Sequence, residues 1–209
     1  MSDDEINRRP IATRGSAWAQ RLASALARTA ITPNQISLAS VLFASAGAVL
    51  LAWWPTPAGL LVCAVCIQLR LLCNLVDGMV AMEGGKASPV GKIYNEFPDR
   101  IADSLLIVAL GYACGQAWLG WLGALLAALT AYVRVFGGSL GLVQDFRGPL
   151  AKPQRMAVLT VACIVGAAET FWHVERYALL AAAIVIAAGS WLTCVTRTRA
   201  IAALLRSGG

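Results

Sequence analysis

Acidic and amide side chains recur at helical spacing in a chain that is otherwise strongly apolar. Asn74 and Asp77 lie three residues apart, and Asn95, Asp99 and Asp103 follow one another at intervals of four. Each set therefore falls on one face of a helix. A charged side chain near the centre of a bilayer costs roughly 2.5–3.5 kcal/mol on insertion scales, so such residues are expected to have a function. Two such faces on neighbouring helices would form a pocket lined with oxygen atoms.

The chemistry of these five side chains points to a divalent cation. Carboxylate and amide oxygens without histidine or cysteine suit Mg²⁺ or Mn²⁺ rather than zinc. His173 is the single histidine of the chain, and the Cys63-x-x-Cys66 pair lies among apolar residues, where packing is the favoured interpretation. A hard cation neutralises phosphate oxygens, and a nearby carboxylate can accept the proton of an attacking hydroxyl. The pattern therefore indicates a phosphate or diphosphate substrate.

The elements that carry this pattern are predicted to be membrane helices. The chain of 209 residues is 58% hydrophobic and 13% charged, whereas soluble domains carry about 25% charged residues. A span needs roughly 20 apolar residues. The fold class expected is an all-α membrane protein with six transmembrane helices in one bundle, at residues 34–54, 58–81, 97–115, 117–138, 155–173 and 177–196.

The predicted domain organisation has three parts. Residues 1–31 form a cytoplasmic N-terminal segment, residues 32–200 the six-helix catalytic domain, and residues 201–209 a short cytoplasmic tail. From Ser16 to Thr29 the apolar and basic residues separate onto two faces, which predicts an amphipathic interfacial helix. We favour a membrane anchor over a substrate lid for this helix.

Basic residues set the expected orientation. They gather before the first span, in the second and fourth loops and at the C-terminal end, while the opposite loops hold Arg176 alone. The positive-inside rule then places both termini and the acidic pattern on the cytoplasmic side. The net charge of +6 is interpreted as a topology signal. No nucleic-acid partner and no cleavable signal peptide are expected.

The acidic pattern resembles the motif of the CDP-alcohol phosphotransferase family, D-x2-D-G-x2-A-R-x8-G-x3-D-x3-D. Every spacing matches without a gap, and Thr32-Pro33-Asn34 also resembles the usual entry to the first span. The resemblance covers almost the whole chain, because six spans with cytoplasmic ends are typical of the family. The positions that keep the residue of the motif are Asp77, Gly78, Ala81, Gly91 and Asp99.

Three positions depart from the motif. Asn74 and Asn95 replace aspartates, and Met82 replaces the arginine. The loss of two negative charges is expected to weaken cation binding or to reduce the number of cations. Asp103, one turn further along its helix, and Arg70, one turn before Asn74, are the candidate replacements. This combination resembles a divergent bacterial-type subfamily.

The resemblance implies roles for individual residues. Asp99 would be the general base and also a metal ligand, Asp77 a metal ligand, and Asp103 a further catalytic and metal-binding carboxylate. Asn74 and Asn95 would be neutral ligands or groups that position the ligands. The nucleotide pocket would be lined by Gly78, Ala81 and Gly91.

Basic residues near this site are candidates for substrate binding. Arg134 ends the fourth span, and the loop and helix start after it carry Arg147, Lys152 and Arg155, with Arg70 on the acidic side. Such side chains can hold a phosphate, although positive-inside topology also explains them. If they bind substrate, a phosphorylated acceptor such as glycerol-3-phosphate or inositol phosphate is favoured over serine or a free polyol.

The resemblance implies a phospholipid-synthesising phosphatidyltransferase of the bacterial cytoplasmic (inner) membrane, with its active site facing the cytoplasm. A phosphatidyl group would pass from CDP-diacylglycerol to a polar alcohol, releasing CMP, with Mg²⁺ or Mn²⁺ as cofactor. Membrane lipids are the other expected partners, and the family allows a homodimer. One alternative is transfer of a CDP-linked headgroup to diacylglycerol. Another is a catalytically reduced protein that binds the nucleotide-lipid. A transporter is disfavoured, because inverted repeats with broken helices are not evident.

Structural interpretations of single residues stay open. Asn95 could be a helix N-cap with Pro98 in the first turn. Asp103 could pair with Arg70 or Arg134. Asp77 and the glycine after it could form the exit turn of a helix.

Overall fold

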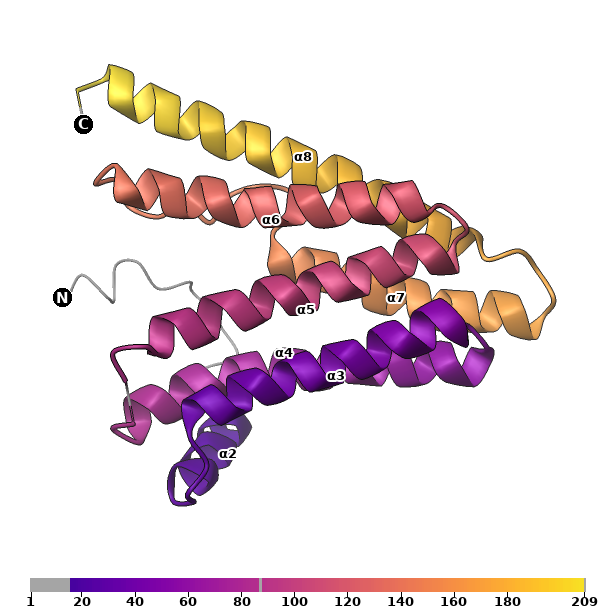
Figure 1. Cartoon of the computed structure of the whole chain (residues 1–209), viewed down its shortest axis with the longest axis horizontal. Coiled ribbons are helices and arrows are strands. Elements are labelled where there is room, and N and C mark those ends of the chain that lie inside the picture. Colours follow the sequence, from indigo (N-terminus) through magenta and orange to yellow (C-terminus); the bar gives the residue numbers. More distant parts are fainter. Residues whose placement is uncertain (1–15, 87, 209) are drawn as a thin grey trace.

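The structure, a computed structural model, describes residues 16–86 and 88–208, and this part of the chain forms seven α-helices (Figure 1). All six stretches predicted as spans are helical. The third begins at Gly91, earlier than predicted, and the last continues to Arg206. Residues 1–15 of the predicted N-terminal segment lie outside the described residues. The helices are α2 (Ala17–Ala27), α3 (Pro33–Trp53), α4 (Pro57–Glu83), α5 (Gly91–Ala113), α6 (Ala117–Ser139), α7 (Lys152–Phe171) and α8 (Tyr177–Arg206).

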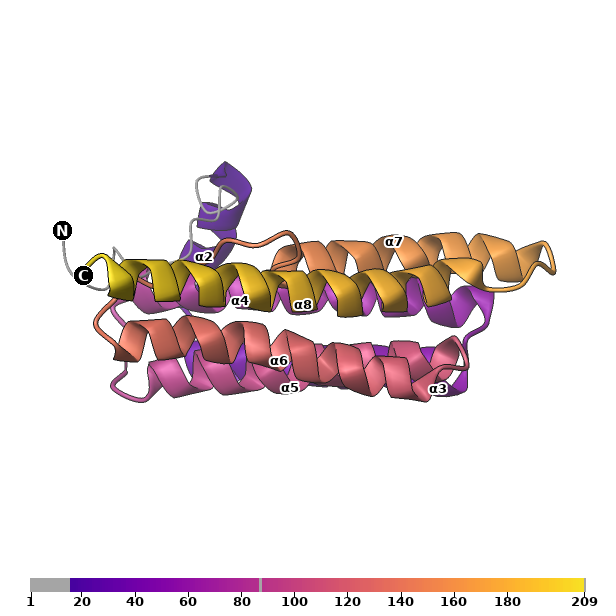
Figure 2. The same cartoon turned by 90° about the horizontal axis from the view of Figure 1, so that it is seen from above.

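Six of these helices lie side by side in two layers. Helices α3, α5 and α6 form one layer and α4, α7 and α8 the other (Figure 2). The connection from α4 to α5 and the end of α8 lie at one end of the bundle, and the connections α3–α4, α5–α6 and α7–α8 lie at the other (Figure 1). Helix α2 sits at an angle to the bundle and packs on α4.

Five of the described helices are long and apolar enough to cross a membrane: α3, α4, α6, α7 and α8. The chain is therefore an integral membrane protein of the helical type. Helix α5 has 23 residues, about 35 Å at roughly 1.5 Å per residue, but its first half carries Glu96, Asp99, Arg100 and Asp103. A sixth span by α5 remains a prediction.

Sequence signals explain where two of the long helices begin. Thr32 caps α3: its hydroxyl accepts from the Gln35 amide at 3.3 Å, and the Gln35 side chain accepts from the Thr32 amide at 2.9 Å. Thr56 caps α4 by accepting from the amide of Gly59 at 3.1 Å. A proline follows each threonine at the first helical position, where its missing N–H is harmless.

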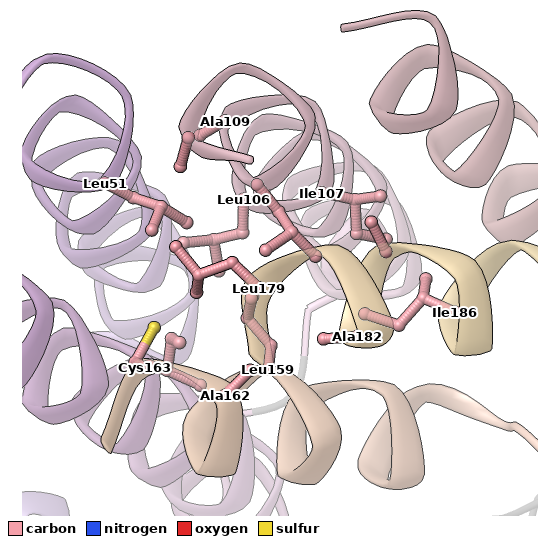
Figure 3. Close-up of a cluster of buried hydrophobic side chains, with 14 of the residues drawn as sticks. Leu51, Leu106, Ile107, Ala109, Leu159, Ala162, Cys163, Leu179, Ala182 and Ile186 are labelled. Atoms are coloured by element: carbon pink, nitrogen blue, oxygen red, sulfur yellow. The ribbon is translucent and has the colours of Figure 1, made fainter. Parts of the chain in front are cut away.

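The bundle interior away from the acidic pattern is filled by aliphatic side chains. Figure 3 shows Leu106 of α5, Leu159 of α7, and Leu179 and Ile186 of α8 gathered between the helices, with Leu51 of α3 beside them. All five are completely buried. Between membrane helices such residues act mainly through close packing, because lipid is as apolar as they are.

Helices α5 and α6 approach each other through glycine. A Cβ atom added at Gly120 would lie 2.8 Å from the Gly111 Cα and 2.9 Å from the Val108 carbonyl oxygen. The two backbones therefore touch at this point, as small residues permit between membrane helices. This contact fixes α5, which carries most of the acidic residues, against its neighbour.

We expect Gly120→Val to destabilise the bundle, because the added side chain must push α5 and α6 apart. Overpacking of this kind costs about 1–3 kcal/mol. Thermal unfolding in detergent measures the effect, with Ala181→Val at an exposed position of α8 as the control. Equal melting temperatures for the two variants would contradict the close approach.

Candidate active site

Helices α3, α4 and α5 bring the predicted acidic residues together. The Asn74 amide on α4 donates to the Asp99 carboxylate on α5 at 2.6 Å. Asp77, 4% exposed, accepts from the Ser37 hydroxyl of α3 and from the backbone amide of Gly78, both at 2.5 Å. The two predicted helical faces therefore meet, as the spacing indicated.

Asp103 lies deeper and is held by two arginines. Its Oδ1 atom accepts from Arg70 at 2.5 Å and its Oδ2 atom from Arg155 at 3.2 Å. Of the two partners that the sequence left open for Asp103, Arg70 is confirmed and Arg134 is wrong. With both oxygens paired and the residue 2% exposed, the arrangement favours a structural ion pair. A role of Asp103 as metal ligand or catalytic group stays a prediction.

Lys152 enters the cluster because its helix begins inside the bundle. The chain after α6 turns back along the bundle, so α7 starts near its middle and not at its end (Figure 1). The Lys152 ammonium lies 2.5 Å from the Asp99 Oδ2 atom. Arg70 reaches the Oδ1 atom of Asp99 at 3.5 Å, and Arg100 reaches Oδ2 at 3.7 Å. Asp99 thus faces three cations and an amide.

The buried charges of this cluster balance, since the Arg100 side chain is 25% exposed and also pairs with Glu96 at 3.7 Å. Three carboxylates, of Asp77, Asp99 and Asp103, share the space with the cations of Arg70, Lys152 and Arg155. These cations are buried or nearly so, with side chains 0%, 13% and 1% exposed. We call these six residues, with Asn74, the charge cluster.

Arg70 keeps spare hydrogen-bonding capacity. Among the described residues its Nε and Nη1 atoms find no acceptor. A buried donor without an acceptor costs about 1–3 kcal/mol. Both nitrogen atoms are completely buried, and the replacement of the arginine missing at Met82 by Arg70 stays a prediction.

Two structural alternatives for the motif residues are wrong. Helix α5 begins at Gly91, so Asn95 is not an N-cap and Pro98 lies inside the helix. Asn95 is exposed, one turn before Asp99, and its predicted role as ligand is untested. Helix α4 continues to Glu83, so Asp77 does not mark a helix exit.

The residues predicted to line the nucleotide pocket flank the cluster on its two helices. Gly78 and Ala81 continue α4 beyond Asp77, and Gly91 opens α5. All three are partly exposed, so the surface beside the cluster is open at these small residues.

The predicted basic residues divide into two groups. Lys152 and Arg155 belong to the charge cluster. Arg134 instead pairs with Glu96 at 2.6 Å, and Arg147, whose side chain is 70% exposed, pairs with Asp145 at 3.0 Å. Burial tends to raise the pKa of Asp145, but hydrogen bonds from Arg147 outweigh it and hold that pKa below its ordinary value. Arg134 and Arg147 both line a cavity of about 240 Å³ between the ends of α6 and α8.

Sequence reasoning missed the residues that fix the loop before α7. Arg197 on α8 is 4% exposed and donates to the Arg147 carbonyl at 2.8 Å and to the Thr130 carbonyl at 2.6 Å. Thr193 accepts from the Leu150 amide at 3.1 Å. The spacing of Thr193 and Arg197, four residues apart on one helical face, was the available signal. These contacts set how deep Lys152 lies.

The donor set fits a hard cation only in part. Asp77, Asp99 and the amide oxygen of Asn74 are ligands that Mg²⁺ accepts. Across residues 16–86 and 88–208, however, no three Asp, Glu, His or Cys side chains converge where they could hold a metal ion. With Asn74 and Asn95 in place of the aspartates of the motif, the described residues lack the carboxylates that such a group would need.

We expect Asp103→Asn to destabilise the protein strongly, since it leaves Arg70 and Arg155 buried without their counter-ion. Breaking one partner of a buried pair costs about 3–5 kcal/mol. Asp145→Asn makes the same change beside the exposed Arg147, where exposed pairs are worth about 0–1 kcal/mol. Thermal unfolding in detergent compares the two, and equal losses would refute the structural role of Asp103.

The chain was compared with protein-family models, with curated proteins and with solved structures. No family model matches. The chain is 34% identical over 191 residues to the archaetidylinositol phosphate synthase of Aeropyrum pernix, covering 90% of this chain and 92% of that protein. It is 27% identical over 129 residues to the inner membrane protein YnbA of Escherichia coli, covering 61% of this chain and 64% of that protein.

The fold is also that of a solved enzyme. Phosphatidylinositol phosphate synthase PgsA1 of Mycobacterium tuberculosis, with CDP-DAG bound, matches at a TM-score of 0.74 with 21% identity, over 89% of this chain and 94% of that one. The complex of PgsA1 with manganese and citrate matches at a TM-score of 0.73. At this identity the likeness shows the fold. The identity to the Aeropyrum enzyme over 90% of the chain and the motif at Asp77 and Asp99 show that the chain belongs to the CDP-alcohol phosphotransferase family.

Proposed function

We propose that the protein transfers a phosphatidyl group from CDP-diacylglycerol to a polar alcohol and releases CMP. The observation that carries this proposal is the charge cluster, in which acids and cations of three helices meet inside a membrane protein. The CDP-DAG bound to PgsA1 supports this choice of donor. The name of the Aeropyrum relative, an archaetidylinositol phosphate synthase, supports transfer of a lipid-linked phosphate group but names a different lipid. Both termini and the cluster are proposed to face the cytoplasm of a bacterial inner membrane.

The reaction makes and breaks one phosphorus–oxygen bond. The acceptor hydroxyl oxygen bonds to the phosphorus that carries diacylglycerol. The bond from this phosphorus to the bridging oxygen breaks, and CMP leaves with the electron pair. The proton of the hydroxyl must go to a base within hydrogen-bonding reach.

Asp99 is the best placed of the acids to take this proton. Its side chain is 12% exposed, against 3% for that of Asp103. Asp77 is also more deeply buried, at 4% exposed against 9% for the whole Asp99 residue. Asn74 donates to one oxygen of Asp99, and this contact orients the carboxylate toward the space shared with Lys152.

The cations of the cluster are suited to the diphosphate. Lys152 is a compact point charge at the more exposed side of the cluster, and Arg70 adds a completely buried positive charge behind it. Both can attract phosphate oxygens, and in a low-dielectric site such contacts are stronger than in water. Mg²⁺ or Mn²⁺ held by Asp77, Asp99 and Asn74 would supply further neutralisation of the diphosphate. The manganese in PgsA1 supports a divalent cation of this kind.

We propose a phosphorylated polyol, inositol phosphate first, as the acceptor. The name of the Aeropyrum relative supports this choice. The cavity lined by Arg134 and Arg147 is the proposed place for a phosphate on the acceptor, which would compete with Glu96 and Asp145 for these two arginines. Glycerol-3-phosphate carries the same group and is the second candidate. The homodimer that the family allows stays a prediction.

The donor is tested by CMP release from purified protein in detergent. CDP-diacylglycerol is supplied with Mg²⁺ or Mn²⁺ and, in turn, inositol phosphate, glycerol-3-phosphate, inositol and serine. We expect release with a phosphorylated acceptor and little with the unphosphorylated ones. Release only from a CDP-linked headgroup with diacylglycerol would reverse the roles of donor and acceptor. If no donor gives CMP release and the protein still binds CMP, the protein binds the nucleotide-lipid without turnover.

The base is tested by Asp99→Asn, which cannot take the acceptor proton. Loss of a positioned base typically lowers the rate by about 10²–10⁴-fold, so we expect kcat to fall at least about 100-fold. The control is Glu169→Gln, the same kind of change near the C-terminal end of α7, which is the end far from Lys152 and the charge cluster. A kcat of Asp99→Asn close to that of the wild type, with the fold retained, would refute the assignment.

A further inference from the structure

The charge cluster departs from the family motif in a consistent direction. Two positions that are acidic in the motif are amides here: Asn74, which contacts Asp99, and Asn95, which is exposed one turn before it. Each replacement removes a negative charge in or near the pocket. At the same time Lys152 places a positive charge 2.5 Å from Asp99. Fewer carboxylates together with a built-in cation reduce the attraction of the pocket for metal ions.

We propose that Lys152 takes the place of one metal ion, so that the site holds a single divalent cation. This inference rests on the proposed function, in which the substrate is a diphosphate. The ammonium would neutralise phosphate oxygens whether or not a metal ion is bound. Asp77, Asp99 and Asn74 remain as the ligands of the one cation.

The balance of charge supports a single cation. Before any ligand binds, three carboxylates face three buried or nearly buried cations. A CDP-linked diphosphate brings two negative charges, which one divalent cation neutralises. A second divalent cation would leave an excess of two positive charges in a pocket inside a membrane protein, where unpaired charge is costly.

The position of Lys152 is built into the fold. Its helix starts deep in the bundle, and Arg197 and Thr193 hold the preceding loop in place. Gly148 lies against Thr193 in a backbone conformation that only glycine adopts readily, with φ of 131°. These contacts fix the start of α7, and with it the depth at which Lys152 meets Asp99.

Counting bound manganese tests the inference directly. Wild-type protein in detergent is titrated with Mn²⁺, and the free ion is followed by electron paramagnetic resonance. We expect one tight Mn²⁺ per chain, with or without CMP. Two tight Mn²⁺ per chain would overturn the proposal. The count does not depend on turnover.

The role of Lys152 itself is tested by CMP binding in EDTA. Isothermal titration should show that the wild type keeps measurable affinity for CMP without metal. We expect Lys152→Met to weaken the affinity for CMP at least 10-fold, whereas Lys152→Arg, which keeps the positive charge, should retain most of it. Arg176→Met removes a cation at the opposite end of the bundle, which donates to the Pro55 carbonyl, and should bind CMP like the wild type.

The outcomes separate this inference from the proposed function. CMP affinity that is lost in EDTA for the wild type, or is unchanged by Lys152→Met, would overturn the role of Lys152 even if CMP is released in the assay. One Mn²⁺ per chain and lysine-dependent CMP binding, without CMP release from any donor, would leave the inference standing and refute the proposed function. If Lys152→Met does not fold, the manganese count and Lys152→Arg still decide.

Discussion

Three carboxylates and three basic side chains share a space between α4, α5 and α7 from which water is largely excluded. Each buried ion alone would cost several kcal/mol, even after the surroundings relax. Arg70 and Arg155 are tolerated because Asp103 lies between them, and Lys152 because Asp99 meets it. The helices that carry these groups must therefore stay in one register. The ion pairs constrain the fold as much as they define the site.

The other contacts of the bundle keep the helices in the register that the ion pairs require. Glycine contacts hold α5 against α6, and aliphatic packing fills the half of the bundle away from the charges. Helix α8 fixes the loop that lets α7 begin deep inside the molecule, through Arg197 and Thr193. Asp103, with Arg70 and Arg155, lies at the buried side of the site, and Asp99 lies at the more exposed side. This order places the proposed base where a substrate hydroxyl can reach it.

Much of this could be predicted from the sequence, because local rules decide it. Apolar runs predicted the six long helices, and threonine–proline pairs explain why α3 and α4 begin where they do. The spacing of Asp77, Asp99 and Asp103 predicted a shared pocket and, through the motif, the family. The start of α5 was predicted six residues late, since Pro98 and the charges beside it obscured the helical pattern.

The parts that could not be predicted depend on distant contacts. Nothing near Lys152 in the sequence indicates that its loop folds back along the bundle and brings it to Asp99. The partner of Asp103 could be narrowed to two arginines, but Arg155 was not among them. Ser37 carried no signal, because a serine in a membrane helix commonly bonds its own backbone. Such pairings follow from the helix arrangement as a whole.

The most direct test of the account is an experimental structure of the protein with CDP-diacylglycerol and Mn²⁺. The account predicts that the diphosphate lies beside Asp99, with a phosphate oxygen on the Lys152 ammonium and one Mn²⁺ on Asp77 and Asp99. A diphosphate bound away from the charge cluster would contradict the proposed site. Two Mn²⁺ ions at the diphosphate, with Lys152 turned away, would contradict the role given to the lysine.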